Sequence, residues 1–344
     1  MQPVRIAVIG AGLIGRKHVE YTMACPDALL VAVADPDPSA RALAEANGAA
    51  FWADPSQMLA EGGIDGAIVA TPTALHEPVG LQCIGAGVHA LIEKPICHDV
   101  GSARRLCEAA DAAGVRLLTG HHRRYNPLLA EASRIIQRGD LGRLVGLSAT
   151  WSVAKPAHYF DQVWRRQPGG GPVLTNLIHE IDLMRAMIGE IREISAMTSS
   201  AVRGFDTEDT AAIALRFENG ALGTVFLSDT GASPWTWEQA TGENSTTFPV
   251  SGQNSYRIFG TEAALEFPLL RVWRHDQTPD WMTPIHPSPR DVAQKDAYTQ
   301  QIAHFARVIR GQEEPIVSGH DGMKTLAATL AVFEAASTGA TVRL

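Results

Sequence analysis

The sequence predicts an α/β protein in which a doubly wound parallel sheet is followed by an α+β domain with an open, mainly antiparallel sheet. Three observations predict this class. Short apolar runs alternate with helical patterns up to residue 120, a glycine-rich turn joins the first run to the first helical pattern, and paired runs with hairpin signals follow His121. The 344 residues fit two domains, expected at 1–120 and 121–344, and the C-terminal helices are free to pack back on the first domain.

The expected elements of the first domain alternate in type. The predicted strands are 5–9, 29–34, 49–52, 66–70, 88–92 and 115–119. The predicted helices are 12–23, 39–46, 77–86 and 102–113. The strands are short apolar runs closed by turn residues such as Thr71-Pro72. This spacing is typical of parallel strands joined by helical crossovers.

The second half changes pattern. The predicted helices are 126–138, 172–188, 298–310 and 322–337, and the predicted strands are 145–153, 191–202, 210–218, 221–228, 256–260 and 264–267. Asn219-Gly220 joins two alternating strands and is the strongest hairpin signal in the chain. Residues 233–253 and 277–289 are expected to be surface loops. We therefore expect an antiparallel sheet with helices on one face.

Composition limits the functional class. The chain has 29 Lys and Arg against 37 Asp and Glu, so no basic surface for nucleic acid or an anionic membrane is expected. Four cysteines without CxxC spacing predict reduced thiols in a cytoplasm. No apolar run reaches the ~20 residues that span a bilayer, and no signal peptide is evident. The doublet His121-His122 lacks a ligand pattern, so no metal is expected.

A glycine-rich turn indicates a nucleotide site. Gly10, Gly12 and Gly15 form GxGxxG directly after a strand, and Leu13 and Ile14 open the following helix. Glycines permit a tight turn and close backbone approach to a pyrophosphate, while the helix N-terminus supplies N–H groups and partial positive charge. The sequence therefore predicts that these five residues bind a dinucleotide in a Rossmann domain.

Four further residues are expected to complete the cofactor site. Asp35 ends the second strand and is placed to accept hydrogen bonds from the adenosine ribose, which favours NAD over NADP; an incidental strand-end Asp is the alternative. Thr71 and Pro72 end a parallel strand at the ligand-binding edge and are expected beside the nicotinamide. His76 lies one turn after Thr71 and is also expected to bind the cofactor; a packing role is the alternative.

Three segments together resemble the Gfo/Idh/MocA oxidoreductases, and the resemblance covers nearly the whole chain. They are Glu93-Lys94-Pro95, residues 70–76 (ATPTALH) and residues 169–182 (GGGPVLTNLIHEID). The resemblance implies an N-terminal NAD-binding Rossmann domain and a C-terminal α+β domain whose open sheet face makes oligomer contacts. A homodimer or homotetramer that acts on a small polyhydroxylated substrate is therefore expected.

Lys94 is the predicted catalytic residue. It ends a strand at the ligand-binding edge, and Pro95 fixes the backbone that aims it. An ordinary lysine titrates near ~10.4, so acid–base work near neutral pH requires burial or a nearby cation. The resemblance implies that Lys94 exchanges the proton of the hydroxyl being oxidised. Glu93 and Lys94 are also expected to line the cofactor site.

Thr175 and His179 are expected to share one face of a helix, at i and i+4. The resemblance implies a substrate-orienting and catalytic role for this pair, although many relatives have Asp where this chain has Thr175, with Asn176 beside it. A threonine does not accept a proton at neutral pH, so Lys94 and His179 are predicted to transfer it. A structural helix histidine is the alternative for His179.

Further substrate contacts are expected from cationic and aromatic side chains near these segments. The candidates are Arg123, Trp164 and Arg165, and also Trp235 and Trp237, for which loop packing is the alternative. The leading prediction is an NAD-dependent dehydrogenase that oxidises a secondary alcohol of a sugar, polyol or cyclitol. Three alternatives remain: a glycosidase that transiently oxidises C3 with tightly held NAD, a nonenzymatic NAD-sensing regulator, and a dehydrogenase for a hydroxy acid or semialdehyde, whose carboxylate would pair with the arginines.

Overall fold

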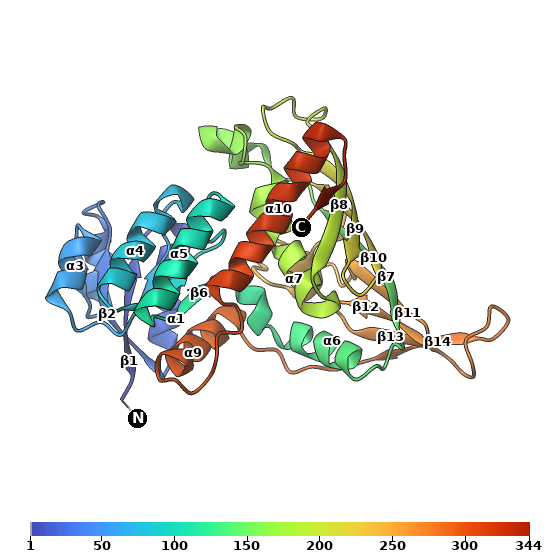
Figure 1. Cartoon of the computed structure of the whole chain (residues 1–344), viewed down its shortest axis with the longest axis horizontal. Coiled ribbons are helices and arrows are strands. Elements are labelled where there is room, and N and C mark those ends of the chain that lie inside the picture. The colour runs from blue at the N-terminus through green and yellow to red at the C-terminus, as the bar shows by residue number, and fades with distance from the viewer. Residues whose placement is uncertain (1) are drawn as a thin grey trace. The chain divides into compact units, whose positions relative to one another are not determined.

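The computed structural model describes residues 2–344 and divides them into two compact units (Figure 1). The first unit comprises the chain up to Asn126 together with Lys295–Leu326. The second comprises Pro127–Gln294 and Ala327–Leu344. The first unit therefore contains a segment from the C-terminal part of the sequence in addition to the N-terminal domain.

The first unit is built on a six-stranded parallel sheet with strand order β3-β2-β1-β4-β5-β6. Its strands are β1 (Val4–Ile9), β2 (Ala28–Ala34), β3 (Ala50–Trp52), β4 (Gly66–Val69), β5 (His89–Ile92) and β6 (Leu117–Thr119). The order reverses between β1 and β4, which is the point where open α/β sheets bind ligands beyond the carboxyl ends of their strands. The predicted doubly wound sheet is confirmed.

Helices cover both faces of this sheet. They are α1 (Leu13–Ala24), α2 (Ala40–Ala46), α3 (Pro55–Glu61), α4 (His76–Gly85), α5 (Val100–Ala113) and α9 (Ala297–Ile309). Residues of α1, α2 and α9 share one apolar core with β1 and β2, while α3 and α5 both contact α4. The helix α3 was not predicted from the sequence, although Asp54 caps its N-terminus and Pro55 occupies its first turn, both of which are helix-start signals.

The second unit contains a nine-stranded sheet with strand order β14-β13-β12-β11-β7-β10-β9-β8-β15. Its strands are β7 (Leu144–Ser152), β8 (Ile191–Ser199), β9 (Thr210–Phe217), β10 (Leu222–Ser228), β11 (Tyr256–Gly260), β12 (Ala263–Phe267), β13 (Arg271–His275), β14 (Ile285–Pro289) and β15 (Val342–Arg343). Only β7 and β10 pair in parallel, so the prediction of a mainly antiparallel sheet is confirmed.

One face of this sheet carries the core. Apolar residues of α6 (Pro127–Gln137), α7 (Ile178–Ile188) and the C-terminal part of α10 (Gly319–Thr338) pack against inward-facing residues of the strands. The burial of β9 alternates residue by residue, as expected for a strand with one covered face. This arrangement leaves outward side chains such as those of Met197 and Phe226 exposed.

Two expected loops contain regular structure. Residues 233–253 include the short helix α8 (Trp237–Thr241), and residues 277–289 end in β14, which pairs with β13. Trp237 is completely buried in the core, so the prediction that it contacts substrate is wrong and its alternative of packing holds. An indole of this size stabilises the interior by the apolar area that it removes from water.

Three further observations concern the cysteines, membrane-spanning helices and metal-binding groups. All four cysteines are free and buried. Within residues 2–344, no helix combines the length and apolar character needed to cross a membrane. The same residues contain no group of three or more His, Cys, Asp or Glu side chains arranged to hold a metal ion.

Candidate active site

The glycine-rich turn after β1 is shaped by close packing. Gly10 has φ +94°, and a Cβ there would lie 2.6 Å from the carbonyl oxygen of Ala70. A Cβ on Gly15 would lie 1.8 Å from the carbonyl oxygen of Gly10. A Cβ on Gly12, in contrast, would meet nothing within 4 Å. The first and third glycines therefore close the turn, and the second leaves open space above it.

This open space lies at the N-terminus of α1. Gly12 is the N-cap and supplies no side-chain hydrogen bond to the first N–H groups of the helix, and Leu13 is 82% exposed. Ile14 is half-buried in the same first turn. Uncapped N–H groups and the helix dipole favour a phosphate at such a position. The structure therefore has room and donors for a pyrophosphate where GxGxxG predicts one.

Asp35 connects the end of β2 to this turn. Its Oδ2 accepts a hydrogen bond from the Ala11 N–H at 2.6 Å, and its Oδ1 accepts one from the Asp37 N–H at 2.8 Å. Each carboxylate oxygen has a second lone pair, so these bonds orient the group and leave acceptor capacity for ribose hydroxyls. The role of Asp35 in cofactor selection remains a prediction, but its position beside the turn fits that role.

The loops after β4 and β5 are tied together by His76. Its Nδ1 lies 2.8 Å from the carbonyl oxygen of Pro95, and its Nε2 lies 2.9 Å from that of Thr71. The imidazole is buried, and burial lowers its pKa. Because both ring nitrogens face carbonyl oxygens, the ring fixes the loop that follows Lys94. A direct cofactor contact by His76 stays a prediction.

Thr71 and Pro72 occupy the carboxyl end of β4. Thr71 Oγ1 is buried and makes no hydrogen bond with any described residue, whereas Pro72 is exposed. A buried hydroxyl normally has a partner, so this atom fits a site that a bound group completes. Together with the open glycine turn, Thr71 shows that the first unit has the features that a dinucleotide requires.

Lys94 follows β5, and its backbone is fixed by a buried carboxylate that contacts an imidazole. The Glu93 carboxylate is 7% exposed, lies 2.6 Å from His18 Nε2 through its Oε1, and accepts the Lys94 N–H through its Oε2 at 3.0 Å. Burial alone raises the pKa of Glu93, but the His18 hydrogen bond and nearby positive charges outweigh it and lower that pKa to about 2. Gly120 permits this packing, since a Cβ there would lie 3.0 Å from the Glu93 Cα.

Arg123 lies in the same unit, in the turn His122–Tyr125 after β6. It is buried, and the neighbouring His122 ring stacks on Tyr298 of α9 at a centroid distance of 4.0 Å. Tyr21 of α1 stacks on Tyr298 at 4.7 Å. The segment after β6 is thus held by aromatic packing, and the substrate contact expected of Arg123 stays a prediction.

In the second unit, the expected helix 172–188 begins irregularly. Val173–Leu177 form a π-helical turn, and only Ile178–Ile188 are α-helical. Thr175 lies in the π turn and His179 in the first turn of α7, so the face that they were predicted to share stays a prediction. Thr175 Oγ1 lies 2.8 Å from the Gly171 carbonyl oxygen and 2.9 Å from Asn176 Oδ1. His179 is buried in the first turn of α7.

The glycines before this turn make room for a carboxylate. A Cβ on Gly171 would lie 2.3 Å from Glu208 Oε1, and that oxygen accepts the Val173 N–H at 2.9 Å. A Cβ on Gly170 would lie 2.2 Å from the Trp164 carbonyl oxygen. Glu208 therefore caps the start of the π turn, and its burial raises its pKa.

Trp164 and Arg165 lie in the short helix Val163–Arg166. The Arg165 guanidinium stands 3.9 Å from the ring centroid of Tyr159 and 5.3 Å from that of Trp164, and its Nη1 donates to the Tyr159 carbonyl oxygen at 2.6 Å. Trp164 is exposed, as is Trp235. These two indoles and the stacked arginine are accessible in the second unit, so their predicted substrate contacts remain open.

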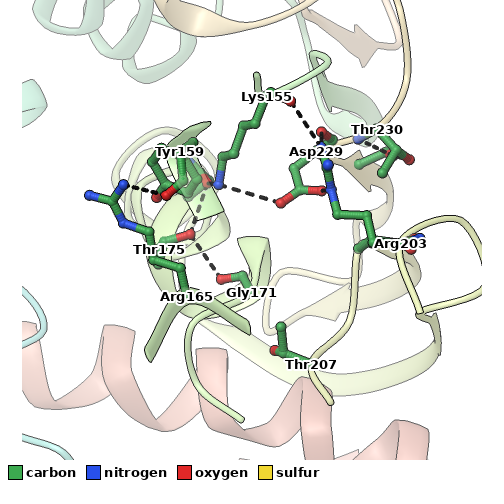
Figure 2. A network of polar contacts seen from close by, with 12 residues as sticks. Lys155, Tyr159, Arg165, Gly171, Thr175, Arg203, Thr207, Asp229 and Thr230 are labelled. Carbon is green, nitrogen blue, oxygen red and sulfur yellow. Dashed lines mark hydrogen bonds and ion pairs between the residues drawn. The ribbon is translucent and has the colours of Figure 1, made fainter. Parts of the chain in front are cut away.

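Lys155 is a residue of this region that was not predicted from the sequence. Its Nζ lies 2.8 Å from Asn176 Oδ1 and 3.6 Å from Asp229 Oδ2 (Figure 2). Burial lowers the pKa of Lys155 to about 8, against the opposing effect of Asp229. Lys155-Pro156 follows a strand in the same way as Lys94-Pro95, and that repeated pattern was the available sequence signal. The structure thus joins Lys155 to two predicted substrate residues, Thr175 and Asn176.

Comparison with known proteins defines the class of this protein. Residues 4–121 match the model of an oxidoreductase family with an NAD-binding Rossmann fold, and residues 129–266 match the model of the GFO/IDH/MocA C-terminal domain. A protein with these two domains is an NAD-binding oxidoreductase that acts on alcohol groups. The chain belongs to the Gfo/Idh/MocA family, as its sequence motifs predict, and its cofactor is NAD.

Individual relatives align with nearly the full length of this chain. The chain is 27% identical to the scyllo-inositol 2-dehydrogenase (NAD(+)) of Bacillus subtilis, over 99% of this chain and 96% of that protein. It is 25% identical to the Myo-inositol 2-dehydrogenase of Thermotoga maritima, over 94% and 93%. The WlbA dehydrogenase of Bordetella pertussis, solved with NADH and UDP-GlcNAcA, superposes with a TM-score of 0.81 at 24% identity over 100% and 99% of the chains. This last similarity shows the fold.

Proposed function

We propose that this protein is an NAD⁺-dependent dehydrogenase that oxidises a secondary alcohol of a polyol, sugar or cyclitol, with Lys94 as the acid–base residue. One observation carries this proposal: the loop bearing Lys94 follows β5 at the same sheet edge as the glycine turn after β1 and Thr71 after β4. Relatives named as inositol dehydrogenases support the substrate class.

The residues of this site are proposed to have distinct roles in binding and proton transfer. Gly12 and the N-terminus of α1 would bind the pyrophosphate, and Asp35 would bind the ribose. The Thr71 hydroxyl would form a hydrogen bond to the cofactor on its nicotinamide side. When bound between these residues, NAD⁺ would supply the hydride acceptor for oxidation of the alcohol. The neutral amine of Lys94 takes the hydroxyl proton, and His179 is proposed as a second proton-transfer group.

The direct test is a panel of polyols, inositols, sugars and sugar acids with NAD⁺, followed at the NADH absorbance band. We expect at least one polyhydroxylated compound to reduce NAD⁺ with saturation kinetics. Cleavage of a nitrophenyl glycoside without net NADH would support the glycosidase alternative instead. Tight NAD binding without turnover of any compound in the panel would contradict the dehydrogenase and support a regulator.

Asp35 is expected to enforce the preference for NAD. In Asp35→Ser, the 2′-phosphate of NADP⁺ no longer meets a carboxylate, so kcat/KM with NADP⁺ should rise relative to NAD⁺ by about 10-fold or more, the effect of ~1.4 kcal/mol. NAD⁺ affinity should fall because the ribose and the Ala11 N–H lose an acceptor. Isothermal titration with both cofactors measures this change, and Asp54→Ser, at the N-cap of α3, is the matched control. Unchanged selectivity would exclude this role for Asp35.

The uncovered face of the nine-stranded sheet is the proposed subunit contact. Met197 of β8 is 73% exposed and Phe226 of β10 is 47% exposed, and a shallow apolar groove runs between these strands beside Ala212 and Ala214. An exposed apolar surface on an antiparallel sheet is typical of an interface. A second copy of this chain is the proposed occupant, so sedimentation should give a dimer or tetramer, and Phe226→Asp should shift it toward the monomer.

A further inference from the structure

A cluster of cationic side chains surrounds two of the proposed substrate residues. Lys155 follows β7, and its side chain is only 9% exposed. Its ammonium contacts the Asn176 side chain, which in turn contacts Thr175. Figure 2 shows the side chains of Lys155, Thr175 and Asp229 near one another, from separate segments of the second unit. Burial of a lysine ammonium costs hydration free energy, which its hydrogen-bond and ionic partners must offset.

The carboxylate beside Lys155 is already shared. Asp229 Oδ1 accepts from Arg203 Nε at 2.8 Å, while its Oδ2 lies 3.6 Å from Lys155. Arg203 also donates through Nη2 to the backbone oxygens of Asp229 and Lys155. One acidic group therefore serves two cations, and this part of the cluster retains an excess positive charge.

Arg165 adds a third cation. Its guanidinium and the Lys155 ammonium both lie over the Tyr159 ring, at 3.9 and 4.7 Å from the centroid. Arg165 Nε is buried without a hydrogen-bond partner among the described residues, and its Nη1 is bonded only to a backbone oxygen. No carboxylate within residues 2–344 forms an ion pair with Arg165, so its charge is available to a ligand.

The charged and titratable groups that face Lys155 come from four directions. Asp229 lies after β10, Arg203 lies after β8, Tyr159 lies in the turn Ala157–Asp161, and Glu238 of α8 acts at longer range. The Glu238 carboxylate accepts the indole N–H of Trp151 and keeps its negative charge, so the three cations Lys155, Arg203 and Arg165 outnumber the carboxylates of Asp229 and Glu238 by one charge. The local balance therefore favours an anion, because fixed cations in a poorly hydrated site attract opposite charge.

We propose that Lys155 and Arg165 bind a carboxylate of the substrate, so that the preferred substrate is a polyhydroxylated acid, such as a sugar acid, and not a neutral polyol. This proposal rests on the proposed dehydrogenase function and narrows its substrate class. Lys155 supplies a point charge next to Asn176, and Arg165 supplies a planar donor set suited to a carboxylate. Thr175 and Asn176 then contact neighbouring hydroxyls.

The test compares matched acid and neutral compounds, such as a hexuronic acid and the corresponding hexose, with wild type, K155M, K155R and R165M. Wild type should prefer the acid in kcat/KM. K155M should lower the ratio of acid to neutral activity by about 10- to 100-fold, the size of one charge-assisted hydrogen bond. K155R keeps the charge and should retain most of the preference. Arg134→Met, which removes an exposed cation of α6, should leave the ratio unchanged.

The pH dependence provides an independent readout. Above pH ~8 the Lys155 ammonium loses its proton, so the acid preference of wild type should decline there, whereas that of K155R should persist because arginine stays charged. Titration calorimetry of the NAD-loaded protein with the acid and the neutral compound gives the same comparison without turnover. Thermal unfolding checks that each variant is folded.

The outcomes separate this proposal from the function on which it rests. If no compound reduces NAD⁺, the dehydrogenase proposal fails, and calorimetry still decides whether Lys155 and Arg165 bind a carboxylate. If wild type oxidises or binds neutral polyols as well as the matched acids, the carboxylate proposal is overturned while the dehydrogenase stands. An acid preference that survives in both K155M and R165M would also overturn it.

Discussion

Replacing Lys94 with methionine is expected to reduce kcat by about 10²- to 10⁴-fold, the usual contribution of a positioned acid–base group. Methionine has a side chain of similar length but no group that can accept or donate a proton. NAD⁺ affinity should change little, because the glycine turn, the N-terminus of α1 and Asp35 supply most of the cofactor contacts and lie on other elements. Steady-state kinetics and calorimetric titration with NAD⁺ measure the two effects separately.

The matched control is Lys295→Met, which removes the same charge from an exposed position. It should leave both kcat and NAD⁺ affinity unchanged. Turnover of Lys94→Met near the wild-type rate would show that another group accepts the hydroxyl proton. Loss of NAD⁺ binding together with turnover would instead assign Lys94 a role in holding the cofactor.

Glu93→Ala is expected to destabilise the protein by about 3–5 kcal/mol, since it leaves the His18 imidazole buried without its acidic partner. The Lys94 N–H would lose its acceptor in the same variant. The control is Glu131→Ala, which breaks an ion pair with Arg134 at the surface of α6 and should cost less than ~1 kcal/mol. Urea unfolding of both variants gives the comparison.

The pKa of Glu93 also sets a pH dependence. Its folded pKa of about 2 lies below the ordinary glutamate value of 4.5, so ionised Glu93 stabilises the folded state. That contribution is complete above the unfolded pKa and is lost as the pH falls through the range between the two values. The difference in unfolding free energy between the wild type and Glu93→Ala should therefore shrink in this acidic range. A difference in unfolding free energy that stays constant there would show that charge is not what stabilises the pair.

Local sequence signals predicted the parallel sheet and the glycine turn of the first unit. Strand and helix alternation predicted the parallel sheet, and GxGxxG with Asp35 predicted the dinucleotide site, because these features depend on residues close together in the chain. The hairpin at Asn219-Gly220 was found for the same reason, and β9 and β10 pair around it. The fold class, the family and the cofactor were therefore available from the sequence.

Short elements and irregular turns were predicted less well. The helix α3 was overlooked because seven residues hold too few apolar positions to show a period, although its cap was present. The π turn at Val173–Leu177 could not be distinguished from an α-helix, because both have the same apolar residues facing the core. For Trp237 the sequence left substrate contact and loop packing both open, because composition does not show which indoles of a loop fold inward.

The sequence by itself determined the fold class, the family, the NAD cofactor and the position of Lys94 at the end of a strand. Tertiary structure alone decided which distant residues meet: His18 with Glu93, and Lys155 with Asn176 and Asp229. Periodicity reports the face of each element, whereas these contacts depend on strand order and on how segments far apart in the chain pack together. The charges that surround Lys155, and with them the proposed preference for an acid, became visible only in the folded chain.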